Sequence, residues 1–368
     1  MTVSTGGKPH LIYAWEDSTS DVHYATKSGG SWSIETIILA DGKWRAGYSL
    51  AFGLGGTLHE LHSEPDAVWH LWNDGSGWQQ EVVTFQQLFY GTSLAIDAEG
   101  YLHGTYALYG NSSLVYITNE SGTWDELVID WCGGDADGDD ARLMLDSTNA
   151  VHIVYADRSL TGVRYATNAS GAWEIAKFDP PRGWDGWFVS ASMGPDDTVH
   201  VADYNEDECS LFYLTNASGE WTRRRLAGFK YTVDQPIITD AGDIHTSIAQ
   251  LYAPGLYYGS SDGVTWTMEE VSTSLLASLG NVAVGPDGTK HLAVASDETT
   301  EIYYAEKAID GGWQLATLDV GDFAIPILRT DSLGRPRVVY HKRAPENHVV
   351  YAERNDDVWE YEQLLISA

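Results

Sequence analysis

The chain has 368 residues, of which 43% are hydrophobic, and its 53 acidic residues outnumber its 21 basic ones for a net charge of -32. This composition supports a sizeable core, while the excess negative charge repels nucleic acid and anionic membrane surfaces. No apolar run approaches the roughly 18 residues of a membrane span. We therefore expect neither a nucleic-acid partner nor membrane insertion.

A tryptophan recurs along the chain at intervals of 45 to 49 residues. The eight positions are Trp32, Trp78, Trp124, Trp173, Trp221, Trp266, Trp313 and Trp359. Each is preceded by a histidine, replaced in the eighth copy by Arg337; the seven are His10, His59, His103, His152, His200, His245 and His291. Eight copies of a unit of about 46 residues therefore fill the chain as one domain, residues 1–368.

Each copy is predicted to form four short strands. The first strand of copy one is short, within residues 1–5 at most, and copy four illustrates the full pattern with strands at 141–145, 151–156, 163–168 and 173–178. Repeated four-stranded units of this length are typical of propeller blades, since radial packing buries both faces of each sheet. We predict an all-β, eight-bladed β-propeller closed by packing between the termini. A seven-bladed ring with a spare half-blade is the alternative.

The stretch Ser260-Ser261-Asp262-Gly263-Val264-Thr265-Trp266 resembles the Asp-box hairpin of sialidase-type BNR propellers. The turns before Trp124, Trp173 and Trp221 are looser versions of it. The resemblance implies a propeller scaffold. It does not imply sialidase activity, because the chain lacks an Arg-Ile-Pro motif near the N-terminus and a convincing trio of substrate-binding arginines.

Five tryptophans outside the repeat pattern map to one predicted face of the ring, where the loops between second and third strands and between blades lie. They are Trp15, Trp44, Trp131, Trp184 and Trp187. Exposed indoles can stack on the apolar patches of a sugar ring. The alternative is that these rings cap the joints between blades. Trp69 and Trp72 are predicted to serve packing.

Titratable residues also replace the usual Tyr-Ala pair at the end of the second strand, as in Tyr155-Ala156. Copy two has His62, copy five has Asp203 and Tyr204, and copy eight has Tyr340, His341 and Lys342. Scaffold packing does not require these groups. His62, Asp203, Tyr204, Tyr340 and His341 are therefore the candidate catalytic residues, with Lys342 as a candidate ligand contact.

Three arginines, Arg45, Arg142 and Arg182, could neutralise an acidic group of a ligand in this acidic protein. Local salt bridges to loop carboxylates are the alternative. Gln235, with Arg142 and Asn281, replaces a serine at the start of the inner strand, so these side chains would ring the channel with hydrogen-bonding groups.

The acidic loop that contains Asp135, Asp137 and Asp139 has closely spaced oxygen ligands, as calcium sites require. A solvated loop is the alternative, and no cofactor is expected to be required.

The first seven residues lack the charged and apolar regions of a signal peptide. The protein is therefore either cytoplasmic, or secreted or periplasmic with its leader already removed. We favour the secreted or periplasmic location.

These residues favour a monomeric, carbohydrate-recognising propeller that binds a glycan or another small molecule. A polysaccharide-degrading enzyme is the alternative, either a lyase using His62, Tyr340 and His341 or a glycoside hydrolase using Asp203. A protein-interaction platform or an enzyme that transforms a small molecule in the channel would fit the same scaffold.

Overall fold

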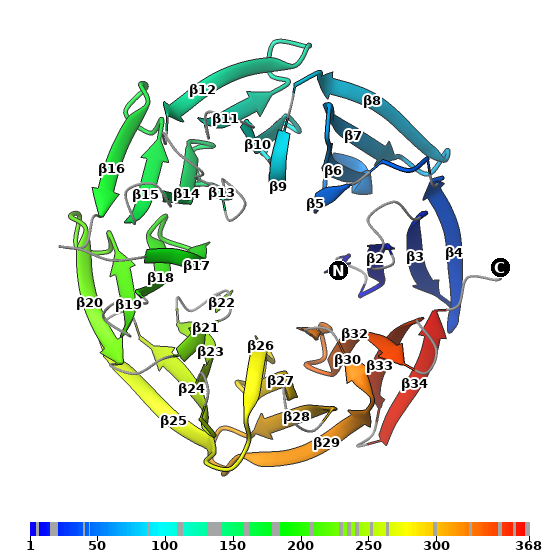
Figure 1. Ribbon diagram of the computed structural model, residues 1–368, viewed down its shortest axis with the longest axis vertical. Coiled ribbons are helices and arrows are strands. Elements are labelled where there is room, and N and C mark those ends of the chain that lie inside the picture. The colour runs from blue at the N-terminus through cyan, green and yellow to red at the C-terminus, as the bar shows by residue number, and fades with distance from the viewer. Residues whose placement is uncertain are drawn as a thin grey trace.

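The eight repeats form eight antiparallel sheets arranged as a closed ring (Figure 1). This is the eight-bladed propeller predicted from the sequence, and the seven-bladed alternative is wrong. The computed structural model describes residues 1–4, 7–14, 21–39, 41–43, 45–86, 88–108, 113–131, 141–157, 162–178, 185–205, 210–227, 231–233, 237–239, 243–250, 253–262, 265–296, 300–323, 326–344, 348–355 and 358–364.

The blades follow the order of the sequence. Blade 1 contains β1 (Thr2–Val3), β2 (Pro9–Ala14), β3 (Val22–Ser28) and β4 (Ser31–Ile38). Blade 2 contains β5 (Ala46–Phe52), β6 (Leu58–Glu64), β7 (Ala67–Asn73) and β8 (Trp78–Thr84). Blade 3 contains β9 (Leu88–Ile96), β10 (Leu102–Leu108), β11 (Ser113–Thr118) and β12 (Asp125–Trp131). Blade 4 contains β13 (Arg142–Leu145), β14 (Val151–Asp157), β15 (Gly162–Thr167) and β16 (Glu174–Phe178), within one residue of the predicted bounds.

The second half continues the series, with a divided inner strand in two blades. Blade 5 contains β17 (Asp185–Met193), β18 (Val199–Asn205), β19 (Ser210–Thr215) and β20 (Thr222–Ala227). Blade 6 contains β21 (Tyr231–Val233), β22 (Ile237–Ile238), β23 (Ile244–Gln250), β24 (Leu256–Ser261) and β25 (Trp266–Ser272). Blade 7 contains β26 (Ala277–Val284), β27 (Lys290–Ser296), β28 (Glu301–Lys307) and β29 (Gln314–Val320). Blade 8 contains β30 (Asp322–Phe323), β31 (Ile327–Thr330), β32 (Pro336–Ala344), β33 (His348–Asn355) and β34 (Val358–Leu364).

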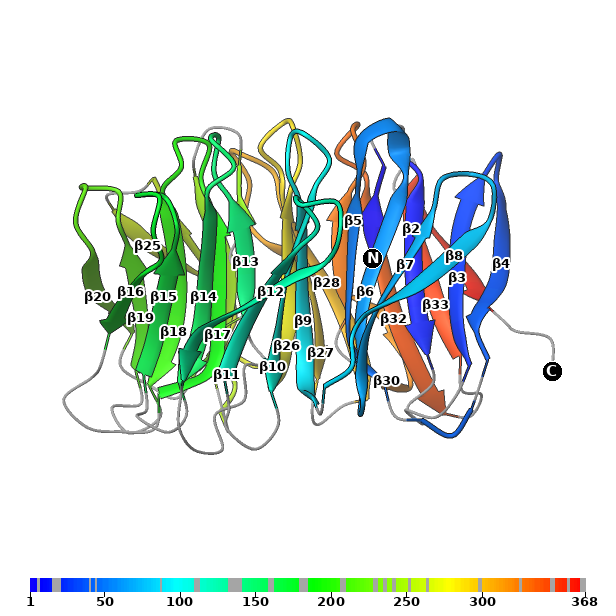
Figure 2. The same cartoon turned by 90° about the horizontal axis from the view of Figure 1, so that it is seen from above.

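Seen edge-on, the ring is a disc whose strands run from one face to the other (Figure 2). Because successive strands are antiparallel, the connections between first and second and between third and fourth strands share one face. The opposite face carries the connections between second and third strands and between blades, and we call it the ligand face. No helix in the described part of the chain is long and apolar enough to cross a membrane.

The hydrophobic core lies between the blades. The second strand β10 is buried almost along its whole length, whereas most residues of the outer strand β12 are exposed. One cluster joins Tyr116 of blade 3 to Ile153 of blade 4, and comparable clusters join other neighbouring blades. A second strand lies between two neighbouring sheets and is shielded from water on both faces, so its polar residues, such as His103 and Thr105 of β10, are buried as well.

The repeated histidine holds each blade together from within. In blade 4 the Nδ1 atom of His152 lies 2.5 Å from the hydroxyl oxygen of Tyr165 on the next strand. The same His–Tyr hydrogen bond recurs in blades 1, 3, 5, 6 and 7, and Arg337 donates to Tyr351 in blade 8. In blade 2 the tyrosine is replaced by His70, which lies 3.0 Å from His59. Because the histidine makes the same bond in almost every blade, its role is to hold the second and third strands of the blade in place.

The repeated tryptophan joins each blade to the one before it. Its indole lies against the tyrosine of that His–Tyr pair, or against His70, with ring centroids 4.8 to 5.6 Å apart at all eight joints. Mostly edge-on or tilted arrangements of this kind add to the energy of apolar burial. The eighth such contact, Trp32 of blade 1 against Tyr351 of blade 8, closes the ring. Lys27 adds ion pairs to Glu353 and Glu362 there, so closure is by packing between terminal blades.

We expect Trp32→Ala to lower the free energy of unfolding by about 2 kcal/mol, because a large aromatic contact is lost at a partly buried site. Urea denaturation followed by circular dichroism measures the change. Val358→Ala is the control, since Val358 is 61% exposed on the same pair of terminal blades. Equal effects of the two substitutions would contradict closure through Trp32.

Polar groups on the inner strands form hydrogen bonds between neighbouring blades. The hydroxyl of Ser49 donates to the carbonyl of Thr92 at 2.7 Å, Ser93 accepts from the amide of Leu143 at 3.0 Å, and Asn281 accepts from the amide of Leu328 at 3.0 Å. Of the residues expected to ring the channel with hydrogen-bonding groups, Asn281 is bonded to the next blade. Close contact also explains Gly47 (φ 67°), where a Cβ atom would lie 2.4 Å from the Thr92 nitrogen.

Candidate functional site

Each joint between blades carries an equivalent set of four residues toward the ligand face, which we call the interblade socket. One comes from the outer strand of the preceding blade, and three come from the second, third and fourth strands of the following blade. At the joint of blades 3 and 4 these are Asp130, Tyr155, Arg164 and Ile175. At the joint of blades 1 and 2 they are Ile38, His62, Trp69 and Gln80. The same four positions can therefore be compared between one joint and another, to see which sockets are filled by their own side chains and which are open.

The socket between blades 3 and 4 is closed by an ion pair. Arg164 is 2% exposed and its guanidinium binds the carboxylate of Asp130, which also accepts a 2.7 Å hydrogen bond from Tyr155. Burial acts to raise the pKa of Asp130, but the bonds from Tyr155 and Arg164 outweigh it and lower that pKa below its usual value. This socket is filled by its own side chains.

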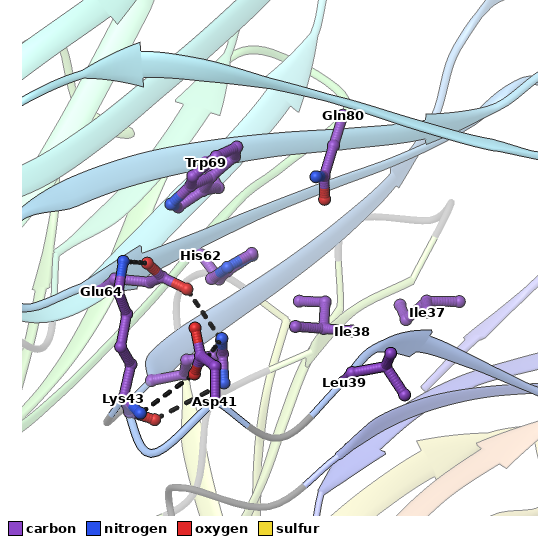
Figure 3. A pocket seen from close by; sticks show the side chains of 10 residues that line it. Ile37, Ile38, Leu39, Asp41, Lys43, His62, Glu64, Trp69 and Gln80 are labelled. Carbon is purple, nitrogen blue, oxygen red and sulfur yellow. Dashed lines mark hydrogen bonds and ion pairs between the residues drawn. The ribbon is translucent and has the colours of Figure 1, made fainter.

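The socket between blades 1 and 2 is open and forms a pocket of about 360 Å³, which we call the blade 1–2 pocket. Figure 3 shows His62 lying between Trp69 and the group formed by Asp41 and Lys43. The ten lining residues are Ile37, Ile38, Leu39, Asp41, Lys43, Arg45, His62, Glu64, Trp69 and Gln80. The volume lies in the usual range for small-molecule sites, about 300–1,000 Å³.

A network of ion pairs forms one wall of the blade 1–2 pocket. Arg45, 5% exposed, donates from Nε to Glu64 at 2.9 Å and from Nη2 to Asp41 at 2.8 Å. Lys43 donates to the second Glu64 oxygen at 2.8 Å. Although burial opposes it, bonding from the Lys43 amide and the Arg45 side chain lowers the pKa of Asp41. Lys43 also lies 3.4 Å from Asp66 Oδ1, so both cations are already bound to carboxylates.

A buried His–Glu pair lies beside this network. His62 and Glu60 are 1% and 0% exposed, and the His62 Nδ1 atom lies 2.9 Å from Glu60 Oε2. The ring of Tyr48 lies 5.7 Å from that of His62, and burial followed by the charge of Glu60 raises the pKa of the Tyr48 hydroxyl. The indole nitrogen of Trp69 and Oε1 of Glu60 have no hydrogen-bond partner among the described residues.

Tyr340 and Lys342 lie together at the joint of blades 7 and 8. The Tyr340 hydroxyl donates to Asp319 at 2.8 Å, and Lys342 contacts both oxygens of that carboxylate at 3.0 and 3.1 Å. Burial first, and Asp319 second, raise the pKa of Tyr340. The arrangement repeats Tyr155 and Asp130 of blades 3 and 4. The intervening His341 is partly buried on β32.

Asp203 lies in the socket between blades 4 and 5, across the ring from blade 1 (Figure 1). It is 1% exposed, its Oδ2 lies 3.5 Å from Arg223 Nη2, and its Oδ1 has no partner among the described residues. Burial raises its pKa to about 6 against the opposing charge of Arg223. The structure thus brings His62 and Arg45 together, and Tyr340 and Lys342 together, but distributes the catalytic candidates over three joints.

The other predicted residues are placed as follows. Trp131 is 65% exposed at the ligand-face end of β12, and Arg142 is partly buried, with Nη1 3.4 Å from the Ala141 carbonyl oxygen. For Trp187 and Tyr204 only the backbone, on β17 and β18, is described. Outside the described residues lie Trp15, Trp44, Arg182, Trp184, Gln235, Asp135, Asp137 and Asp139.

Sequence reasoning missed Trp69, which was interpreted as a packing residue. It lines the blade 1–2 pocket because it pairs in register with His62 across β6 and β7. His62 departs from the tyrosine usual at its position, whereas the position of Trp69 varies from copy to copy, so its register with His62 was the available signal. Trp72, three positions further on, stacks on His70 and does pack.

One group within the described residues could hold a metal ion. Ligand atoms of Asp97, His103 and Glu120 lie within 4.8 Å of one another. His103 is the repeat histidine, bonded through Nδ1 to Tyr116, and Asp97 accepts turn amides. The scaffold therefore accounts for two of the three groups.

No protein-family model and no curated protein matches the chain. Solved structures match it at low identity. A polysaccharide lyase described as an ulvan lyase of a new family is 12% identical with a TM-score of 0.52, covering 87% of this chain and 94% of its own. An arginine variant of AofleA from Arthrobotrys oligospora is 12% identical with a TM-score of 0.50, covering 100% and 93%. A prolyl endopeptidase is 12% identical with a TM-score of 0.53, covering 86% of this chain and 50% of its own. The likeness shows the propeller fold alone.

Proposed function

We propose that the chain is a carbohydrate-recognising β-propeller that binds a neutral saccharide in the blade 1–2 pocket. The observation that carries the proposal is the lining of that pocket, where an indole and an amide, Trp69 and Gln80, share a concave surface with the Arg45–Glu64 pair. An indole face stacks on the C–H patch of a sugar ring, and planar polar groups bind its hydroxyls as donors and acceptors.

The charges of the pocket favour a neutral ligand over a uronic acid. Arg45 and Lys43 already bind Glu64 and Asp41, so a ligand carboxylate would have to compete for them. A protein of net charge -32 also repels polyanions at long range. Trp131, 65% exposed on the same face, supports the wider proposal of an aromatic-rich ligand face.

We expect Trp69→Ala to weaken saccharide binding about tenfold, which corresponds to about 1.4 kcal/mol, because the stacking surface is lost. Binding is followed by tryptophan fluorescence and calorimetry against galactomannan, xyloglucan, alginate and polygalacturonate. Trp72→Phe is the matched control, since Trp72 lies on the same strand and stacks on His70. Binding that is equally strong in all three proteins would move the site elsewhere.

A polysaccharide lyase is the second candidate, and the Glu60–His62 pair favours it. A carboxylate that orients an imidazole is a common arrangement for a general base, and Tyr48 lies beside it. The ulvan lyase of similar fold has also been solved bound to -[GlcA(1-4)Rha3S]-. At 12% identity this supports only the capacity of the scaffold for such a role.

The same polysaccharide samples separate the two candidates. A lyase would produce new unsaturation and shorter chains from alginate or polygalacturonate, and His62→Ala would slow that turnover by about 10²–10⁴-fold. Circular dichroism confirms that the variant is folded. Binding without products favours recognition, whereas products unaffected by His62→Ala would remove His62 from the mechanism.

A further inference from the structure

A second pocket opens at the joint of blades 7 and 8, with a volume of about 290 Å³. We call it the blade 7–8 pocket. Its lining residues are Leu318, Asp319, Lys342, His348, Val350, Tyr361 and Gln363. They come from the outer strand of blade 7 and from the last three strands of blade 8.

The two pockets are built at equivalent positions of the repeat. Val350 pairs in register with Tyr340 as Trp69 pairs with His62. Counted from the repeat tryptophans and histidine positions, Asp319 corresponds to Ile38, Lys342 to Glu64 and Tyr361 to Gln80. The same socket is thus left open twice, on either side of the unit formed by blades 8 and 1.

A buried histidine without a partner distinguishes the blade 7–8 pocket. His348 is 3% exposed, and neither of its ring nitrogens has a hydrogen-bond partner among the described residues. By contrast, the repeat histidine His291 is bonded through Nδ1, 2.6 Å from the Tyr304 hydroxyl, and only its Nε2 lacks a partner among the described residues. An unpaired buried polar group costs about 1–3 kcal/mol, and a polar ligand in the pocket would remove that cost at His348.

The remaining groups define the chemistry of that partner. The charge of Lys342 is matched by Asp319, which also accepts from Tyr340. A neutral imidazole offers one donor and one acceptor, and the exposed Gln363 amide offers both kinds of group. A hydroxyl can donate to the unprotonated ring nitrogen or accept from the protonated one, and it adds no charge. The described lining residues include no indole, so polar contacts would dominate recognition.

We propose that the blade 7–8 pocket is a second saccharide site, which takes one neutral sugar residue with a hydroxyl bound by His348. The inference rests on the proposed function of the blade 1–2 pocket and extends it. Two sites on one rigid ring would let one chain bind two residues of a polysaccharide, so that affinity for polymers exceeds affinity for single sugars.

The test titrates the full chain with the neutral methyl glycosides of glucose, galactose, mannose and rhamnose. Native mass spectrometry counts bound sugars, and nuclear magnetic resonance of ¹⁵N-labelled histidine follows the ring nitrogens of His348, assigned by their loss in His348→Leu. We expect two sugars per chain, a shift of the His348 signals on binding, and one sugar per chain in either His348→Leu or Trp69→Ala. The double variant should bind none.

The outcomes separate the two proposals. One sugar per chain, lost in Trp69→Ala and kept in His348→Leu with no shift of His348, overturns the second site and leaves the proposed function intact. Binding to neither pocket overturns both. Because His348→Leu replaces an unpaired polar group by an apolar one, its fold should survive; if it does not, Gln363→Ala at the exposed rim replaces it and should weaken the second site at least threefold.

Discussion

Arg164→Val should lower the free energy of unfolding at neutral pH by about 3–5 kcal/mol. Arg164 is 2% exposed, and its removal leaves the Asp130 carboxylate, 14% exposed, without its cation at the joint of blades 3 and 4. Tyr155 still donates to that oxygen at 2.7 Å. Valine is chosen because Val350 occupies the equivalent socket position in blade 8.

The double variant Asp130→Leu/Arg164→Val is the control for charge. Replacing a whole buried ion pair by apolar residues is often close to neutral, so the double variant should recover most of the lost stability. The pH dependence gives a second check. The pKa of Asp130 is lowered in the folded protein, so its contribution is complete above the ordinary aspartate pKa of about 4 and is lost as the pH falls further.

Urea denaturation of the wild type and both variants at pH 7 and pH 3 measures these effects. The single variant should come closer to the wild type at pH 3, because below the ordinary aspartate pKa the unfolded chain takes up the Asp130 proton and the stability that the ionised carboxylate gives the wild type falls. A deficit that stays constant with pH would mean that packing of the Arg164 stem accounts for the loss.

The fold could be predicted because the scaffold residues recur in nearly every copy. A Trp at one end of the blade and a His on the second strand each make one contact, and eight repetitions make that pattern visible without an alignment. The divided inner strands of blades 6 and 8 were not predicted. They depend on where β21 and β30 separate from β22 and β31, and short segments of two or three residues carry too little periodicity to reveal it.

The site was predicted only in part, because its residues bond to partners in neighbouring blades. Departure from the repeat identified His62, which lines one pocket with Arg45, the latter identified as an arginine that could neutralise an acidic ligand. It could not show that Tyr340 bonds Asp319 or that Ser49 bonds Thr92, because those partners belong to neighbouring blades. A residue's role in a propeller is set by the blade it faces, and single-strand patterns do not contain that information.

Asp203→Asn should make the protein more stable relative to the wild type as the pH rises, by about 2 kcal/mol between pH 4 and pH 7. Burial raises the pKa of Asp203 from 3.8 to about 6. Well below pH 3.8 the carboxyl is protonated in both states and costs nothing. As the pH rises toward 6 the unfolded chain releases the proton while the folded chain holds it, so the wild type loses stability that asparagine, which does not titrate, retains.

The difference between the two unfolding free energies, measured by urea denaturation at pH 4, 5, 6 and 7, isolates this residue, since the other titrating groups are common to both proteins. Asp196→Asn is the control of opposite sign. Asp196 is exposed and its pKa is lowered, chiefly by the hydrogen bond from Thr198, so the wild type gains stability over that variant as the pH rises through the acidic range. A difference that does not change with pH would mean that Asp203 is solvated in the folded protein. The predicted rise would establish a buried carboxyl that holds its proton near pH 6, which is the property a general acid in the socket of blades 4 and 5 would require.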